Sequence, residues 1–92
     1  MNKGELIDAV ARNSGESKAT AAKVIDETLD VIVAATVAEG KVQLTGFGTF
    51  EARDRKARMA RNPQTGAEVH VPATRVPAFK AGKSFKDAVK PG

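Results

Sequence analysis

The main chemical feature of the sequence is a cluster of cationic side chains in one short segment. Five of the nine residues from position 53 to position 61 are basic: Arg53, Arg55, Lys56, Arg58 and Arg61. Guanidinium groups are planar and bind phosphate oxygens bidentately, so arginine suits oriented contacts better than lysine does. A run of charge is often only a solvated surface. The preference for arginine instead favours a phosphate-rich partner such as nucleic acid.

A turn-forming stretch, Asn62 to Gly66, directly follows the cationic segment. Its Pro63 has two interpretations. The residue can simply shape the turn, or its rigid ring can act as an apolar wedge between base pairs in a DNA minor groove. In the second case, Arg61 and Asn62 would hydrogen-bond the acceptors of that groove, which carry little sequence information.

These side chains require an extended ribbon to carry them. Val69 and Val71 alternate with polar residues, which predicts a strand that returns beside the cationic one. Pro72 and Pro77 cannot donate to a neighbouring strand, so we expect an edge strand. The predicted ribbon covers residues 53–75, is narrow enough for a DNA groove and has no apolar face. We expect it to be mobile until a partner binds.

Charge is divided unevenly along the chain, which has 92 residues and a net charge of +4. Residues 1–40 contain four basic and seven acidic residues, whereas residues 41–92 contain eleven and four. The two parts therefore have net charges of −3 and +7. A basic half beside an acidic half favours a directed anionic partner.

The residues that catalytic and metal sites need are scarce. The chain has no cysteine, and His70 is its single histidine. No nucleophile has an adjacent base, no ligands have the spacing of a metal site, and Gly46-Phe47-Gly48 lacks the helix and Lys-Ser/Thr of a phosphate loop. We therefore expect a protein that is not an enzyme and has no cofactor or metal.

No segment predicts a membrane-spanning or secreted protein. The longest mostly apolar run, Val31 to Ala38, is far shorter than the roughly 18 residues that a spanning helix needs. Charged Lys3, Glu5 and Asp8 lie where a signal peptide would be apolar. With no cysteine to form disulfides, the expected location is the cytoplasm, with no membrane partner.

Helices and short strands surround the ribbon. Ser17 is a good N-cap, and the absence of Gly and Pro between it and the stop at Gly40 predicts a long helix. An alternation of period two after Gly40, interrupted by a tight turn at residues 46–48, predicts two strands. The predicted elements are helices over residues 3–13, 18–39 and 83–89 and strands over residues 41–45 and 49–52.

These elements are too few to build a sufficient core from one chain. Without the ribbon, 69 residues remain, a size at which small domains need partners or staples. The long helix is apolar nearly all round from Leu29 to Ala38, so it needs cover on more than one side. We predict a symmetric homodimer. We expect the four phenylalanines to form core, not a base-stacking platform: Phe47, Phe50, Phe79 and Phe85.

Several motifs of the chain occur together in one known family. They are Gly46-Phe47-Gly48-Thr49-Phe50, then Arg55, Arg58 and Ala60, then Asn62-Pro63-Gln64-Thr65. The opening residues 1–6, the passage Arg75-Val76-Pro77-Ala78-Phe79 and Ala81-Gly82-Lys83 are also typical of that family. On these residues the chain resembles the bacterial HU/IHF family of histone-like, DNA-bending proteins, and resembles HU more than IHF.

The resemblance implies an α+β fold in an intertwined homodimer. Each subunit would have an N-terminal helix-turn-helix body, a short antiparallel sheet with an extended β-ribbon arm, and a short C-terminal helix. Residues 1–92 would form a single DNA-binding domain. Residues 1–40 would be its helical dimerisation part, and residues 41–92 would hold the sheet, the arm at 53–75 and the last helix.

The resemblance also implies an architectural protein of the nucleoid. Such a protein binds double-stranded DNA without strong sequence specificity, prefers bent, nicked or flexible DNA, and bends and compacts it by inserting Pro63 into the minor groove. The implied DNA contacts are Arg53, Arg55, Arg58, Arg61, Asn62, Pro63, Gln64 and Arg75 on the arm, and Lys3, Lys80, Lys83 and Lys86 on the body.

The alternative is a basic protein that is associated with RNA or the ribosome. It would have the same charge pattern and the same ribbon. A-form RNA, however, has no minor groove that suits an inserted ribbon. Competition between duplex DNA and duplex RNA distinguishes the two functions.

Overall fold

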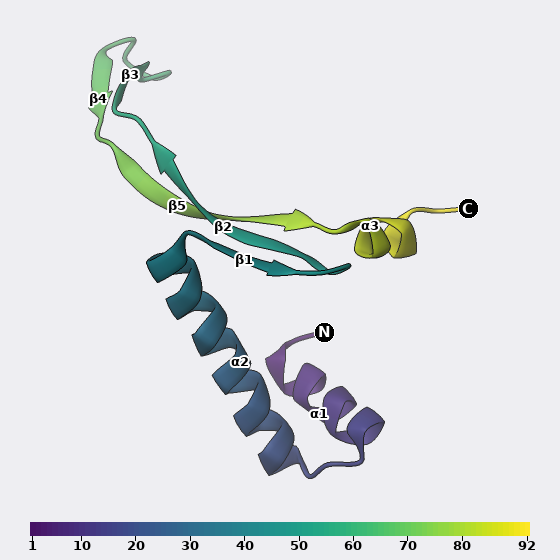
Figure 1. Ribbon diagram of the computed structural model, residues 1–92. Coiled ribbons are helices and arrows are strands. Elements are labelled where there is room, and N and C mark those ends of the chain that lie inside the picture. The colour runs from purple at the N-terminus through teal and green to yellow at the C-terminus, as the bar shows by residue number, and fades with distance from the viewer. The chain divides into compact units, whose positions relative to one another are not determined.

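The computed structural model describes residues 1–92, which form two compact units, residues 1–34 and 35–92. The chain has three helices and five strands, which Figure 1 labels. In chain order they are α1 (Lys3–Ser14), α2 (Lys18–Glu39), β1 (Lys41–Leu44), β2 (Gly48–Arg55), β3 (Arg58–Arg61), β4 (Glu68–Val71), β5 (Thr74–Ala81) and α3 (Lys83–Val89). The α+β class is confirmed, as is each helix that the sequence predicts, to within one residue.

Local sequence explains where the first two helices begin and end. The Asn2 side chain accepts from the Glu5 backbone N–H at 2.9 Å while the Glu5 carboxylate accepts from the Asn2 N–H, a capping box that starts α1. Ser17 Oγ accepts from the Thr20 N–H at 3.1 Å at the start of α2, as predicted. Gly40 ends α2 with a φ of +81°, a conformation that glycine adopts without strain.

The second unit contains a three-stranded antiparallel sheet in the order β1-β2-β5. β2 and β5 pair over eight residues, and Phe50 lies opposite Phe79. Figure 1 shows these two strands side by side along their length. Pro77 lies in β5, an edge strand, which confirms the placement expected from its missing N–H.

The ribbon follows the predicted path, but the prediction of one continuous ribbon was wrong. β2 and β5 pair as far as Arg55 and Thr74, and the separate sheet of β3 and β4 starts at Arg58 and Val71. Two residues on each side are unpaired in the ladder, and one of them is Pro72, which has no N–H to donate. We call residues 53–75 the arm and this interruption the arm break.

The four phenylalanines form one cluster at the base of the sheet. Phe79 lies with its ring centroid 4.9 Å from that of Phe50, 5.5 Å from that of Phe47 and 6.1 Å from that of Phe85. The Gly82 N–H donates to the Phe47 carbonyl at 2.8 Å, which fixes the start of α3 against the turn. The four rings therefore pack against one another, as residues of a core do.

Within a single chain these rings are not fully enclosed. Phe47 remains 47% exposed, Phe79 42% and Phe85 37%, and the only buried apolar side chains are those of Ala11 and Ala21. Leucine and valine side chains of α2 are exposed as well. A stable domain normally buries far more apolar surface than this, so one chain does not make its own core.

Gly48 provides the space that the phenylalanine cluster needs. A Cβ at this position would contact the Phe79 ring and lie 2.7 Å from the Lys80 carbonyl oxygen, whereas a Cβ at Gly4 would meet only the Asn2 side chain at 3.4 Å. A methyl group would therefore be overpacked at Gly48 but not at Gly4.

We expect Gly48→Ala to lower the free energy of unfolding by about 1–3 kcal/mol, the usual cost of overpacking. Urea unfolding at a fixed protein concentration measures it. Gly4→Ala is the matched control and should leave the midpoint unchanged or raise it, since alanine is the better helix former. Equal midpoints for the two variants would contradict this role of Gly48.

Candidate nucleic-acid interface

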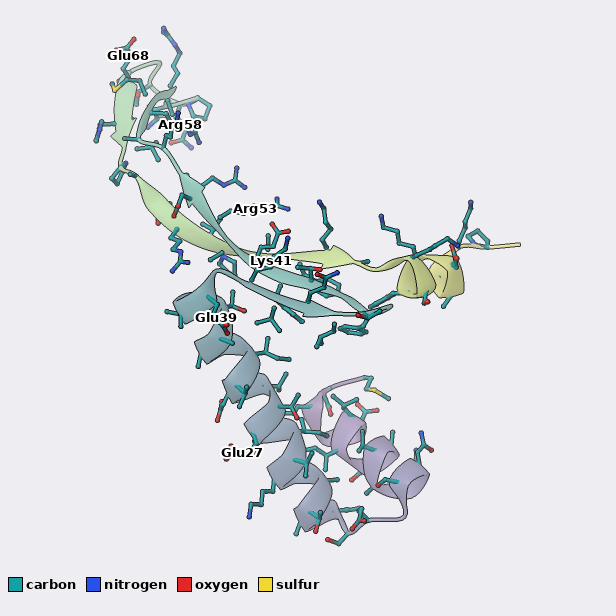
Figure 2. All side chains as sticks on the ribbon, in the orientation of Figure 1. Glu27, Glu39, Lys41, Arg53, Arg58 and Glu68 are labelled. Atoms are coloured by element: carbon teal, nitrogen blue, oxygen red, sulfur yellow. The ribbon has the colours of Figure 1, made fainter.

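The arm presents most of its cations to solvent. Arg53 and Arg55 alternate along β2, and Arg58 and Arg61 begin and end β3; all four are exposed. Figure 2 labels Arg53 and Arg58 on the arm. The strands therefore space positive charge along the whole arm.

The contacts that hold these cations within the chain are few and weak. Arg53 Nε donates to Glu51 Oε2 at 3.3 Å on the surface, and Arg61 Nη1 donates to the Gly66 carbonyl oxygen at 3.2 Å. Exposed ion pairs of this kind contribute roughly 0–1 kcal/mol. A phosphate group can therefore replace them at little cost.

Short-range hydrogen bonds order the arm tip. The Gly66 N–H donates to the Asn62 carbonyl oxygen at 2.7 Å, and the Gln64 N–H donates to Asn62 Oδ1 at 2.8 Å. This Asx turn and the positive φ of Gly66, +73°, close the loop between β3 and β4. Pro63 lies exposed within the loop. The tip thus presents a rigid apolar ring on a preformed turn.

A cationic hollow of about 470 Å³ lies at the arm break. Its lining includes Lys56, which belongs to the cationic segment but not to the DNA contacts that the family resemblance implies. An isolated two-residue gap in pairing has no clear sequence pattern apart from Pro72. The lining residues are Asp54, Arg55, Lys56, Ala73, Thr74 and Arg75.

The predicted lysine contacts of the second unit lie outside the arm. Lys80 is exposed on β5, and Lys83 and Lys86 are exposed on α3. Lys83 Nζ lies 2.9 Å from Asp87 Oδ2, one helical turn further along α3. This exposed pair, like that of Arg53, leaves the cation available to a stronger anion.

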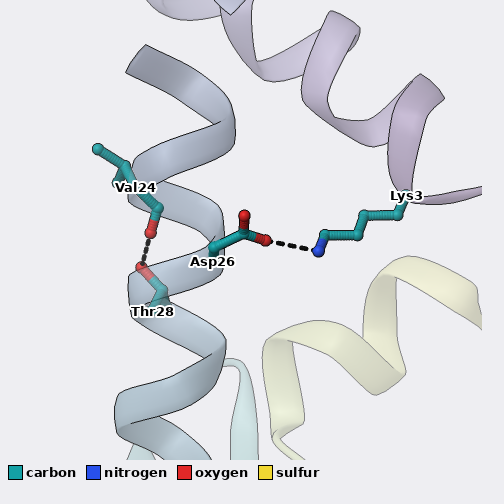
Figure 3. Close-up of polar contacts among 4 residues, drawn as sticks. All are labelled: Lys3, Val24, Asp26 and Thr28. Atoms are coloured by element: carbon teal, nitrogen blue, oxygen red, sulfur yellow. Dashed lines mark hydrogen bonds and ion pairs between the residues drawn. The ribbon is translucent and has the colours of Figure 1, made fainter. Parts of the chain in front are cut away.

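Lys3 forms an ion pair within the first unit. Its Nζ lies 2.5 Å from Asp26 Oδ1 on α2, and Figure 3 shows the two side chains meeting. The hydrogen bond and charge of Asp26, with the charge of Asp30, raise the pKa of Lys3 above its ordinary value. Nearby on α2, Thr28 Oγ1 donates to the Val24 carbonyl oxygen at 2.7 Å (Figure 3). Both partners of the Lys3 ion pair are well exposed to solvent.

Arg75 differs from the other predicted contacts. Its Nη1 donates to the Val37 carbonyl oxygen at 3.1 Å, 38 positions earlier in the chain. The structure therefore brings most of the predicted arm residues together along the arm, but directs this guanidinium to the end of α2.

Comparison with known proteins gives a consistent result over the full chain. The family model described as bacterial DNA-binding protein matches residues 1–90. The DNA-binding protein HU of Geobacillus stearothermophilus is 59% identical, over 98% of this chain and 100% of its own. HU 1 of Bacillus subtilis (strain 168) is 56% identical over 97% of both chains.

Solved structures agree with these sequence comparisons. A cocrystal structure of Anabaena HU with DNA matches with a TM-score of 0.89 and 51% identity, covering 100% of both chains. HU from Thermotoga maritima matches with a TM-score of 0.67 and 36% identity, covering 98% of this chain and 100% of its own.

Proposed function

The chain belongs to the bacterial DNA-binding protein family that includes HU, and from this membership we propose that it is an architectural protein of the bacterial nucleoid that binds and bends double-stranded DNA. The observation that carries the proposal is the arm. It presents exposed arginines on two strand pairs and ends in an ordered tip with an exposed proline.

The arm cations act first, by neutralising phosphates. DNA carries a dense line of negative charge with condensed counterions, and each cation that meets a phosphate releases some of them. Since phosphates are the same in every sequence, binding has little sequence specificity. The proposed phosphate contacts are Arg53, Arg55, Lys56, Arg58 and Arg61, with Lys3, Lys80, Lys83 and Lys86 on the remainder of the chain.

Pro63 acts second, as a wedge. A rigid ring that enters the minor groove unstacks one base step, which costs a few kcal/mol and kinks the duplex toward the major groove. Asn62 already accepts from the Gln64 backbone, so the tip needs little reordering to present the ring. The bend then brings more phosphates within reach of the cations.

A second copy of the chain supplies the missing core. The exposed phenylalanine cluster and the exposed apolar side chains of α2 need cover, and an identical chain presents the same surfaces by symmetry. We propose a single domain over residues 1–92, with residues 1–40 as its dimerisation part and residues 41–92 holding the sheet and the arm. The dimer then carries two arms.

DNA bending sets the preferred substrate and the location. Smooth bending of a site costs of order 1–6 kcal/mol, so nicked or already bent DNA binds more tightly because part of that cost is absent. The site of action is the nucleoid in the cytoplasm. The relatives are named for DNA binding and not for catalysis, and their names give no support to the RNA or ribosome alternative.

The function is tested by gel-shift titration of intact, nicked and four-way-junction DNA over a salt series. Nicked and junction DNA should bind more tightly than intact DNA, and log Kobs should fall linearly with log salt by about 0.9 per phosphate neutralised. Duplex RNA should compete poorly. Equal competition by RNA would favour the RNA alternative.

For Pro63→Ala we expect a smaller DNA bend with a smaller change in affinity, because the wedge is lost while the arm cations stay. Energy transfer between dyes at the two DNA ends measures the bend. Pro91→Ala removes a proline outside the arm and is the matched control. A bend that Pro63→Ala leaves unchanged would rule out the wedge.

Leu29→Asn should weaken the dimer, because it places an amide on the exposed apolar part of α2. Sedimentation equilibrium should give twice 9.7 kDa for the unaltered protein and a shift toward monomer for the variant. Lys23→Asn introduces the same residue in the polar first half of the helix and should stay dimeric. A monomeric unaltered protein would overturn the proposed assembly.

A further inference from the structure

Arg75 makes a contact that none of the other arm cations makes. Its Nη1 donates to the Val37 carbonyl oxygen at 3.1 Å, and its Nε lies 3.8 Å from Asp54 Oδ1. Asp54 is also its direct partner across the β2–β5 ladder. The guanidinium therefore reaches from the arm to the last turn of α2.

The end of α2 needs such a cation. The last four carbonyl groups of a helix have no partner within it, and this end also carries partial negative charge. The Gly40 N–H satisfies the Thr36 carbonyl oxygen at 2.9 Å, and Val37 is the next residue along the helix. The last turn of α2 contains no basic residue and ends on Glu39, which adds to the negative charge. Arg75 supplies what the helix itself lacks.

The same contact lies at the start of the arm. The Ala52 N–H on β2 donates to the Gly40 carbonyl oxygen at 3.0 Å, and Arg75 lies two positions further along the ladder, on β5. Both strands are thus tied to the residues that end α2. Together these bonds fix the direction in which the arm leaves the sheet.

We propose that Arg75 is a positioning residue, which fastens the start of the arm to the C-terminal end of α2 and does not neutralise a DNA phosphate. The role in binding rests on the proposed function, since the arm must bind DNA for its direction to matter. The family resemblance implied a DNA contact at this position, and the proposal replaces that role.

The salt dependence of DNA binding separates positioning from phosphate contact. Arg75→Met keeps the apolar stem and removes the donors; Arg55→Met is the matched control, one position away across the same ladder. Arg55→Met should reduce the slope of log Kobs against log salt by about 0.9 per contact, or about 1.8 for the two arms. Arg75→Met should weaken binding about tenfold at every salt concentration with the slope unchanged.

Arg75→Lys is the second test, because lysine serves well as a point charge for phosphate but lacks the planar fork. A positioning role predicts that Arg75→Lys weakens binding nearly as much as Arg75→Met does. Full binding by Arg75→Lys, or a slope reduced by Arg75→Met as by Arg55→Met, would overturn the proposal.

Hydrogen exchange in the DNA-free protein provides a readout that does not depend on the proposed function. The Ala52 amide, which is bonded to Gly40, should exchange faster in Arg75→Met and at the unaltered rate in Arg55→Met. Unchanged exchange in Arg75→Met would overturn the proposal. If the unaltered protein failed to bind DNA, the proposed function would fail, and exchange alone would still decide the role of Arg75 at the helix end.

Discussion

A single chain of this protein encloses almost no apolar surface. Two alanines are its only buried apolar side chains, while three phenylalanine rings are more than a third exposed. Folding entropy costs about 1–2 kcal/mol per residue for the backbone alone, which so little burial does not offset. Assembly is therefore a condition of folding in the proposed dimer. In the proposed dimer two arms would bind one DNA, so stability and function would have one origin.

Because the arm does not contribute to a core, its residues can serve mainly to bind negative charge. Its strands carry exposed arginines. The few carboxylates that pair with arm cations lie on the surface, where a phosphate group can readily replace them. The most ordered part of the arm is the tip that presents Pro63. The tip is closed by the Asn62 Asx turn and by Gly66, so that Pro63 is presented on a formed loop, whereas the arm break interrupts the ladder between the two strand pairs.

How the arm is attached matters as much as what it carries. A ribbon with no apolar face has no packing to hold its direction, so polar contacts at its start must do so. The Ala52–Gly40 hydrogen bond and the Arg75–Val37 hydrogen bond join both strands to the end of α2. In the proposed role, Arg75 satisfies a free carbonyl group at the end of α2 and at the same time fixes the direction of the arm.

Features that depend only on neighbouring residues could be predicted from the sequence. Ser17 and Gly40 predicted the ends of α2, and the alternation after Gly40 predicted β1 and β2. The cationic run and the stretch from Asn62 to Gly66 predicted the arm and its turn. Caps, alternation and turns can be predicted in this way because they act over a few residues. The arm break, the exposure of the phenylalanine rings and the partner of Arg75 arise only in the folded chain. Pairing register, burial and a hydrogen bond over 38 positions depend on residues that only folding brings together, so no local pattern encodes them.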